Sequence, residues 1–250
     1  MFYHECWPLF HQDNHLLVLY KPAGLIMQRD YRNKANLLDL AKLWIKDRWA
    51  KPGNVFAGMV HRLDGPVAGV VVLARTSKAA ARLSEQFRKG TVEKQYLAVI
   101  EGRLPQETQR LENFLIREGR WTRIVSEAAP GSQMAALNYH VLDSTSRSSL
   151  VEIRLETGRR HQIRAQLAGL GCPIVGDTNY GASQALAHGR IALLACRLSF
   201  DHPTLGTRLR FETTVPRGWS WPMAEDNRNR PLWTIEEYEE TGLVLPAMRG

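Results

Sequence analysis

The sequence VHRLDGPVAGVVVL at residues 60–73 contains two apolar segments separated by a break. Residues 60–63 and residues 70–73 are rich in valine and leucine, which is typical of buried β-strands. Between them, Asp64 is followed by a glycine and a proline, which favour turns and interrupt the pairing of strands. The stretch therefore predicts a strand, a turn and a second strand, with Asp64 where the first strand ends.

Similar patterns continue on both sides of this stretch. Residues 77–89 have the period of an amphipathic helix and are followed by Gly90, a residue common just beyond a helix end. Asn36 is suited to cap a helix that runs through Trp44. Together these patterns predict an α+β fold with a mixed, largely antiparallel central sheet flanked by helices. Further strands are predicted at residues 15–20, 93–101, 136–142, 150–155, 191–200 and 208–214, and further helices at residues 161–170 and 234–237.

The pattern weakens after Pro216, which predicts a main domain over residues 1–216 and a C-terminal appendage over residues 217–250 packed on it. The net charge is +8, and residues 225–250 hold six acidic and three basic residues, so residues 1–224 carry +11. An excess of Lys and Arg favours a polyanionic partner, because these side chains displace counterions from phosphates. We therefore expect such a partner to bind the main domain.

The sequence lacks the residues that several classes of protein require. The three cysteines form no CxxC pair and the eight histidines have no metal-ligand spacing, so neither a disulfide framework nor a metal site is expected. The sequence has no apolar run long enough for a membrane span and no N-terminal secretion signal. Phosphate-loop, serine-hydrolase and zincin motifs are absent as well. We expect a cytoplasmic monomer with no membrane contact, no metal and no small-molecule cofactor.

Four short segments carry the information on function. Taken singly each is ordinary, because Asp64 fits a turn, Tyr96 fits a strand core and Arg164 fits a solvated helix face. In their order and spacing, however, they resemble the RluA-type pseudouridine synthases from about His11 to about Pro216. The segments are Lys21-Pro-Ala-Gly24, His61-Arg-Leu-Asp64, Glu93-Lys-Gln-Tyr96 and Thr157-Gly-Arg-Arg-His-Gln-Ile-Arg164.

The resemblance implies a pseudouridine synthase fold and assigns roles to individual residues. Asp64 matches the catalytic aspartate of the family, Tyr96 its active-site tyrosine, and Arg164 the arginine that pairs with the aspartate. Ile163 and Leu167 match apolar positions near the pocket. Arg62, with His61 beside it, matches a position that helps to hold the RNA open around the extruded nucleotide.

The reaction explains why these residue types are needed. Converting uridine to pseudouridine moves the sugar from N1 to C5 of the base, with no redox change and no added group, so no cofactor is required. An ionised carboxylate must either attack the anomeric carbon or take a proton from C2′, and the sequence leaves both routes open. A cation keeps that carboxylate charged when it is buried, and an aromatic ring retains the detached base. The target uridine must also leave its stack.

Contact with RNA is expected from a basic run with an interleaved aromatic residue, which also fits a solvated hairpin whose Trp packs on the core. We favour ribosomal RNA as the substrate, with transfer RNA as the alternative. Val67 and Ala68 replace the hydroxyl residues usual after the aspartate turn, and Leu194 replaces a usual histidine. This departure keeps open a non-catalytic RNA-binding or assembly factor, and a glycosyl hydrolase is a third reading. The expected RNA contacts are Arg110, Arg117, Arg120, Trp121 and Arg123, together with Arg160.

Overall fold

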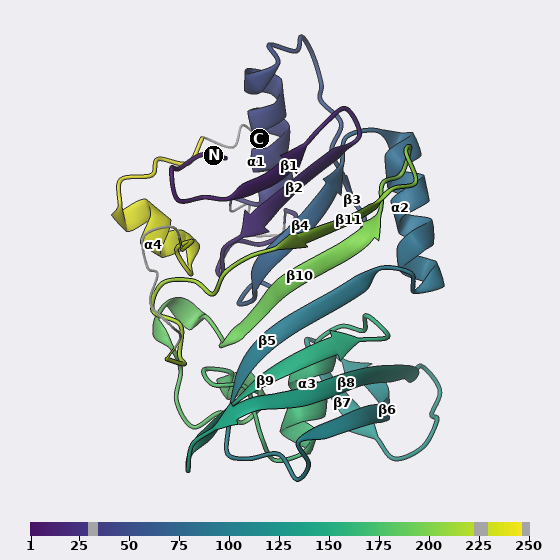
Figure 1. Ribbon diagram of the computed structural model, residues 1–250, viewed down its shortest axis with the longest axis vertical. Helices are drawn as coiled ribbons and strands as arrows, with labels where there is room; N and C mark the ends of the chain where they lie inside the picture. The colour runs from purple at the N-terminus through teal and green to yellow at the C-terminus, as the bar shows by residue number, and fades with distance from the viewer. Residues whose placement is uncertain (30–34, 223–229, 247–250) are drawn as a thin grey trace. The chain divides into compact units, whose positions relative to one another are not determined.

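A computed structural model describes residues 1–29, 35–222 and 230–246. The chain forms two compact units (Figure 1). The first contains Met1–Val92, Cys196–Trp219 and the described residues of the C-terminal segment, and the second contains Glu93–Ala195 with residues 220–222. The expected main domain over residues 1–216 with an appendage over residues 217–250 stays a prediction.

The first unit is built around strands that include four antiparallel pairs, β1–β2, β2–β4, β3–β4 and β10–β11. Their order is β1-β2-β4-β10, with β3 paired to β4 and β11 paired to β10. The strands are β1 (Leu9–Gln12), β2 (Leu16–Lys21), β3 (Gly58–Met59), β4 (Ala68–Ala74), β10 (Leu193–Asp201), which enters this unit at Cys196, and β11 (Arg208–Glu212).

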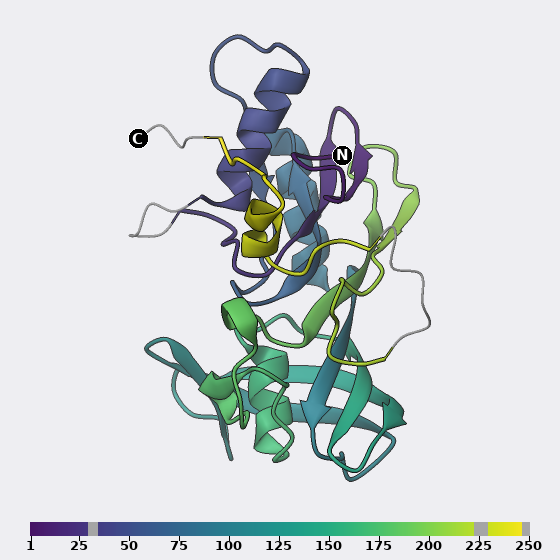
Figure 2. The same ribbon diagram turned by 90° about the vertical axis from the view of Figure 1, so that its left-hand side faces the viewer.

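Strands β2 and β4 form the centre of the first unit, and every residue of both is buried. Such strands need cover on both faces, since their side chains alternate between the two. Helix α2 (Ser77–Lys89) supplies part of it by packing Leu83 into a core cluster with Val18 and Val72. Helices α1 (Leu37–Arg48) and α4 (Ile235–Glu240) belong to the same unit (Figure 2).

The second unit contains an antiparallel sheet in the order β5-β9-β8-β6-β7, with α3 (Gln162–Gly169) packed against it (Figures 1 and 2). Gly169 permits a close approach of this helix to the sheet, because a Cβ there would lie 2.5 Å from Cδ1 of Ile124. Short 3₁₀ turns follow at η1 (Thr178–Tyr180) and η2 (Ala187–Gly189). The strands are β5 (Glu93–Glu101), β6 (Thr108–Glu118), β7 (Trp121–Val125), β8 (Gln133–Ser144) and β9 (Ser148–Leu155).

Most of the predicted elements are confirmed. The mixed, mostly antiparallel α+β class is confirmed, as are α2, β5 and the start of α1, where Asn36 accepts a hydrogen bond from the Asp39 N–H. The predicted strand at residues 60–63 is wrong, because pairing with β4 stops after β3. There Nε2 of His61 accepts the Val72 N–H at 3.0 Å, so a side chain takes the place of a backbone partner. Strands β1, β6 and β7 were not predicted.

None of the helices in the described ranges is both long and apolar enough to cross a bilayer.

Candidate active site

The loop that carries Asp64 is anchored on both sides within the first unit. Before Asp64, the His61 ring bonds to β4 and stacks on Phe87, with centroids 4.9 Å apart and planes inclined by 16°. After it, the Val67 N–H bonds to the Asp64 carbonyl at 3.1 Å and closes the turn. The carbonyl of Gly65 accepts the Gly24 N–H at 2.9 Å. Asp64 itself is half-buried, and the contacts on both sides of it hold the backbone that carries its carboxylate.

A buried ammonium group lies beneath this loop. Lys21 ends β2, is 0% exposed, and donates from Nζ to the carbonyls of Pro22 at 2.9 Å, Leu25 at 2.7 Å and Gly65 at 3.2 Å. Burial lowers the pKa of Lys21 to about 7, while the negative charges of Asp64 and Glu236 act in the opposite direction. Lys21 begins one of the four segments of the resemblance, but no role in the site was predicted for it. The feature of the sequence that could have indicated a role for Lys21 is its position as a charged residue directly after an apolar run, at residues 16–20.

Arg164 lies on α3 in the second unit, and its described partner is another carboxylate. Its Nε and Nη2 donate to the two carboxylate oxygens of Asp177 at 2.6 and 2.8 Å, and both residues are almost fully buried. The guanidinium also lies 4.7 Å from the centre of the Tyr180 ring. Asp177 was not predicted as a site residue. The predicted pairing of Arg164 with Asp64 joins residues of different units and stays a prediction.

The other predicted pocket residues also belong to the second unit. Tyr96 lies on β5 opposite Ile153 and is half-buried. Ile163 and Leu167 point into the interior, with exposures of 5% and 0%. Leu167 therefore contributes to packing in this structure, and its place in a substrate pocket stays a prediction, as does that of Ile163.

Four of the predicted RNA-contact residues lie at the turn between β6 and β7, which we call the 117–123 hairpin: Arg117, Arg120, Trp121 and Arg123. Arg160 donates from Nη1 to the Gly119 carbonyl at 3.1 Å and from Nη2 to the Arg120 carbonyl at 2.9 Å. Trp121 is 37% exposed, and the Arg120 guanidinium lies 5.6 Å from its ring. Arg117 also bonds to the Gly119 carbonyl, so the turn is held by two arginines. The result is an exposed aromatic ring with cations around it.

The Tyr180 hydroxyl connects this hairpin to the helix that bears Arg164. It accepts the Thr122 N–H at 3.0 Å and lies 2.9 Å from Nδ1 of His161, directly before α3. Burial raises the pKa of Tyr180, so the hydroxyl keeps its proton at neutral pH. Tyr180 thus contacts the hairpin through its hydroxyl and the Arg164 guanidinium through its ring.

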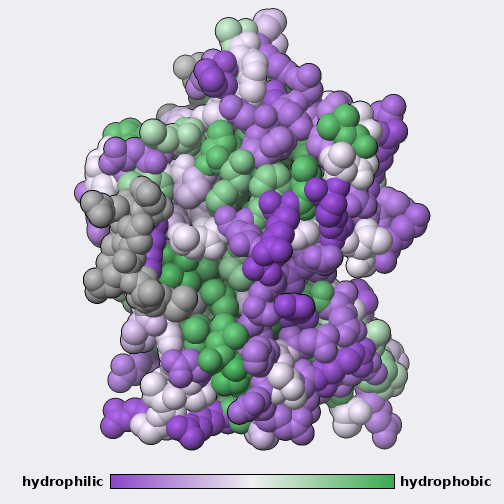
Figure 3. Space-filling model, viewed as in Figure 1, coloured by the Kyte–Doolittle hydropathy of each residue, from purple (hydrophilic) through white to green (hydrophobic). Residues whose placement is uncertain are grey.

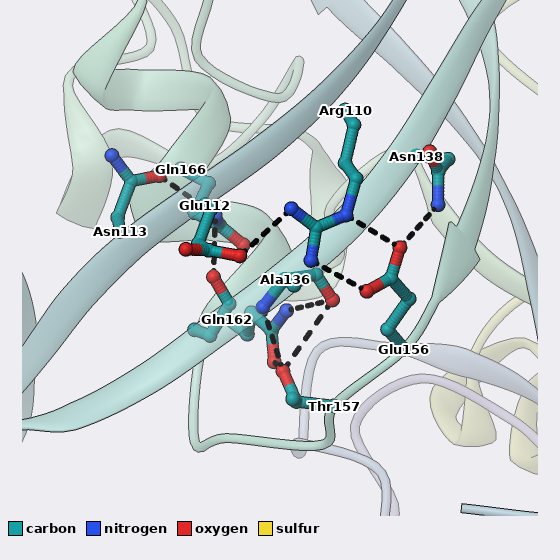
Figure 4. A network of polar contacts seen from close by, with 10 residues as sticks. Arg110, Glu112, Asn113, Ala136, Asn138, Glu156, Thr157, Gln162 and Gln166 are labelled. Carbon is teal, nitrogen blue, oxygen red and sulfur yellow. Dashed lines mark hydrogen bonds and ion pairs between the residues drawn. The ribbon is translucent and has the colours of Figure 1, made fainter.

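Arg110, expected in the same basic run, has a different environment. Figure 4 shows its guanidinium between two carboxylates, with Nε and Nη2 bonded to Glu156 at 2.9 Å each and Nη1 at 2.7 Å from Glu112. Hydrogen bonds to Glu156 and Glu112 raise the pKa of Arg110. Figure 3 shows hydrophilic residues over most of the lower part of this face, beside a hydrophobic patch. Because acids compensate its charge, Arg110 is a weaker candidate for phosphate contact than Arg120.

Two of the predicted residues, His61 and Arg62, lie just before Asp64 in the chain and differ in their surroundings. Arg62 is exposed, as an RNA-contacting side chain would be. The ring of His61 is engaged with Val72 and Phe87, so its observed contacts support the fold. No group of three or more His, Cys, Asp or Glu side chains in the described ranges could hold a metal ion.

The chain is similar to proteins that are named as pseudouridine synthases. Residues 15–169 match the family model described as RNA pseudouridylate synthase. Ribosomal large subunit pseudouridine synthase D of Zymomonas mobilis is 33% identical over 217 residues, which cover 82% of this chain and 68% of that protein. A Bacillus subtilis protein named uncharacterized RNA pseudouridine synthase YhcT is 34% identical over 207 residues, covering 82% and 67%.

Similarity extends to solved structures. The structure of human RNA pseudouridylate synthase domain containing 4 superposes with a TM-score of 0.72 at 27% identity and covers 84% of this chain and 89% of that one. Human RNA pseudouridylate synthase domain containing 1 shares the fold at 22% identity, with a TM-score of 0.65.

Proposed function

The chain belongs to the RNA pseudouridylate synthase family, and we propose that it isomerises uridines of structured RNA with Asp64 as its catalytic carboxylate. The observation that carries the proposal is the anchoring of the Asp64 loop. His61 fixes it to β4, and the Gly65 carbonyl fixes it to the turn after β2. A carboxylate that must meet one sugar carbon benefits from such a fixed backbone, because misplacement of reacting groups slows reactions strongly.

The reaction needs an ionised carboxylate and conserves all atoms of the base. The bond from C1′ to N1 breaks and a bond from C1′ to C5 forms, while the proton on C5 is lost and N1 gains one. Asp64 either attacks C1′ or removes the proton from C2′, and both routes start from the carboxylate form. The charge of Asp64 acts on the buried Lys21 ammonium, so a cation belongs to the surroundings of the proposed carboxylate.

The second unit supplies the other proposed parts of the site. Tyr96 would stack on the uracil while it is detached from the sugar and turns to present C5. Arg164 would act as a counter-ion to Asp64, and its guanidinium is oriented by the bidentate contact with Asp177. Ile163 and Leu167 would complete the apolar wall.

Binding of RNA is assigned to Arg62 and to the 117–123 hairpin, which combines arginines with an exposed Trp. Cations that contact phosphates and rings that stack on bases are the features that hold unpaired nucleotides. The uridine would be flipped out of its stack, which costs a few kcal/mol and is easiest in loops. We favour large-subunit ribosomal RNA as the substrate, with transfer RNA as the alternative, because the similar protein of Zymomonas mobilis carries the ribosomal name.

Tritium release from RNA labelled at C5 of uridine tests the activity. The wild-type protein should release tritium from ribosomal or transfer RNA, and Asp64→Asn should release none above background. Asp47→Asn is the matched control, because Asp47 is an exposed aspartate on α1 away from the loop. Equal release by the wild type and Asp64→Asn would remove Asp64 from the mechanism. Free uracil among the products would indicate a glycosyl hydrolase instead.

A non-catalytic RNA-binding factor is the second candidate, and Val67 with Ala68 is the observation that favours it. Both side chains are buried and apolar, so they cannot donate the hydrogen bonds that hydroxyl residues would supply to the loop. RNA binding by wild type without tritium release from any cellular RNA would support this alternative.

A further inference from the structure

The C-terminal segment reaches the turn that supports the Asp64 loop. Residues 233–235 run beside Ala23 as a short parallel bridge. The Ala23 N–H donates to the Trp233 carbonyl at 2.8 Å, and the Ile235 N–H donates to the Ala23 carbonyl at 2.9 Å. The next residue, Gly24, donates to Gly65. A continuous chain of backbone hydrogen bonds therefore joins the C-terminal segment to the residue after Asp64.

The segment is fixed well enough to hold this turn in place. Trp233 and Tyr238 are both 0% exposed. The Tyr238 ring stacks on Trp7 at 4.9 Å, and its hydroxyl donates to the Cys6 carbonyl at 3.0 Å. Thr234 caps α4 in a reciprocal capping box, which ties the start of that helix to the same strand-like stretch. Aromatic burial and a capped helix together make the segment a rigid part of the first unit.

Glu236 brings a carboxylate to the same place. A Cβ at Gly24 would lie 2.7 Å from Oε2 of Glu236, so the carboxylate lies directly against the turn. Within the described part of the chain, Oε2 is buried and has no hydrogen-bond partner. Its charge acts on the Lys21 ammonium, as that of Asp64 does. A buried carboxylate oxygen without a hydrogen bond is costly, and a nearby ammonium offsets part of that cost.

We propose that Glu236 is a positioning residue, which together with the Trp233–Ile235 backbone holds Lys21 and the turn after β2 and so sets the position of the Asp64 loop. The inference rests on the proposed function, because it concerns the loop of the proposed catalytic carboxylate. Removing the charge of Glu236 leaves Asp64 as the remaining carboxylate whose charge acts on Lys21. The ammonium is then held less firmly, and its bond to the Gly65 carbonyl weakens with it.

Kinetics of Glu236→Gln test the proposal, with Glu239→Gln as the matched control because Glu239 is an exposed residue of the same helix. We expect Glu236→Gln to lower kcat for tritium release about tenfold and to leave KM for RNA within about twofold, since no RNA contact changes. The alkaline limb of the pH–rate profile should move to lower pH, because Lys21 loses its proton more readily without this carboxylate. Glu236→Asp should restore part of kcat, and Glu239→Gln should match the wild type.

Wild-type kcat and an unchanged pH profile for Glu236→Gln would overturn the proposal. If this variant is too unstable to assay, the double variant Lys21→Met with Glu236→Gln removes both buried charges and should fold. Its kcat should remain low, and a wild-type kcat would overturn the proposal equally. Asp64→Asn is assayed in parallel. Activity of Asp64→Asn would refute the proposed function, whereas its inactivity beside a normal Glu236→Gln would refute the positioning role alone.

Discussion

The dependence of stability on pH measures the buried charge of Lys21. Burial lowers its pKa from 10.5 to about 7 in the folded protein, despite the opposing charges of Asp64 and Glu236. Between these two values the unfolded chain binds a proton that the folded chain lacks. The free energy of unfolding therefore rises with pH across this window, and the contribution of Lys21 is constant below and above it.

The size of the effect follows from the two pKa values. A pKa difference of one corresponds to about 1.4 kcal/mol, so the fall from 10.5 to about 7 corresponds to about 5 kcal/mol over the whole window. Lys21→Met removes the titrating group and keeps most of the side-chain volume. The stability of the wild type minus that of Lys21→Met should therefore increase by about 1.4 kcal/mol per pH unit above about pH 7. The variant gains most, relative to the wild type, at low pH.

Urea unfolding followed by tryptophan fluorescence at several pH values provides the measurement. The difference between the free energies of unfolding of the two proteins no longer contains the contribution of any other titrating group that behaves alike in both. Lys51→Met serves as the control, because Lys51 is exposed and its variant should show a constant difference from the wild type. A constant difference for Lys21→Met as well would mean that Lys21 titrates as an exposed lysine does, and the argument for its buried charge would fail.

Three further variants test the second unit. Tyr180→Phe should lose the hydrogen bond to the Thr122 N–H and lower the free energy of unfolding by about 1 kcal/mol, with KM for RNA raised more than kcat is lowered; equal stability would contradict this. Asp177→Asn should lower the free energy of unfolding measured with urea by about 3 kcal/mol, because the bidentate contact with the buried Arg164 guanidinium loses its negative charge. Arg120→Ala should weaken RNA binding about equally for all sequences and reduce the slope of log affinity against log salt by about 1; an unchanged slope would exclude a phosphate contact.

Elements with local signals could be predicted from the sequence. Helix α2 was predicted with both ends correct, because Thr76 caps its start and Gly90 adopts the left-handed conformation just after its end. Strand β5 was also predicted with its bounds, since its apolar run is bordered by charged residues. Strands β6 and β7 were missed because charged residues interrupt their apolar pattern, and their pairing with β8 and with each other is set by the sheet.

Contacts between distant segments could not be predicted in the same way. His61 lies in a stretch with the pattern of a strand, and only the folded chain brings its ring to the Val72 N–H. Arg164 donates to the carboxylate of Asp177, and nothing in the sequence near either residue indicates that these two side chains meet. The family resemblance identified Asp64, Tyr96 and Arg164 and predicted that Arg164 pairs with Asp64. It did not indicate the buried Lys21 or the contact of Arg164 with Asp177.

Support for the Asp64 loop comes from both ends of the sequence, and this limits what the His-Arg-Leu-Asp motif alone determines. The Gly65 carbonyl is held by Lys21 and Gly24, which precede it by about forty residues, and that turn is held in turn by Trp233. A change in the C-terminal segment should therefore alter the Asp64 loop without altering any residue of the motif. For this reason variants at Glu236, and not only at Asp64, show whether the buried Lys21 serves catalysis or only folding.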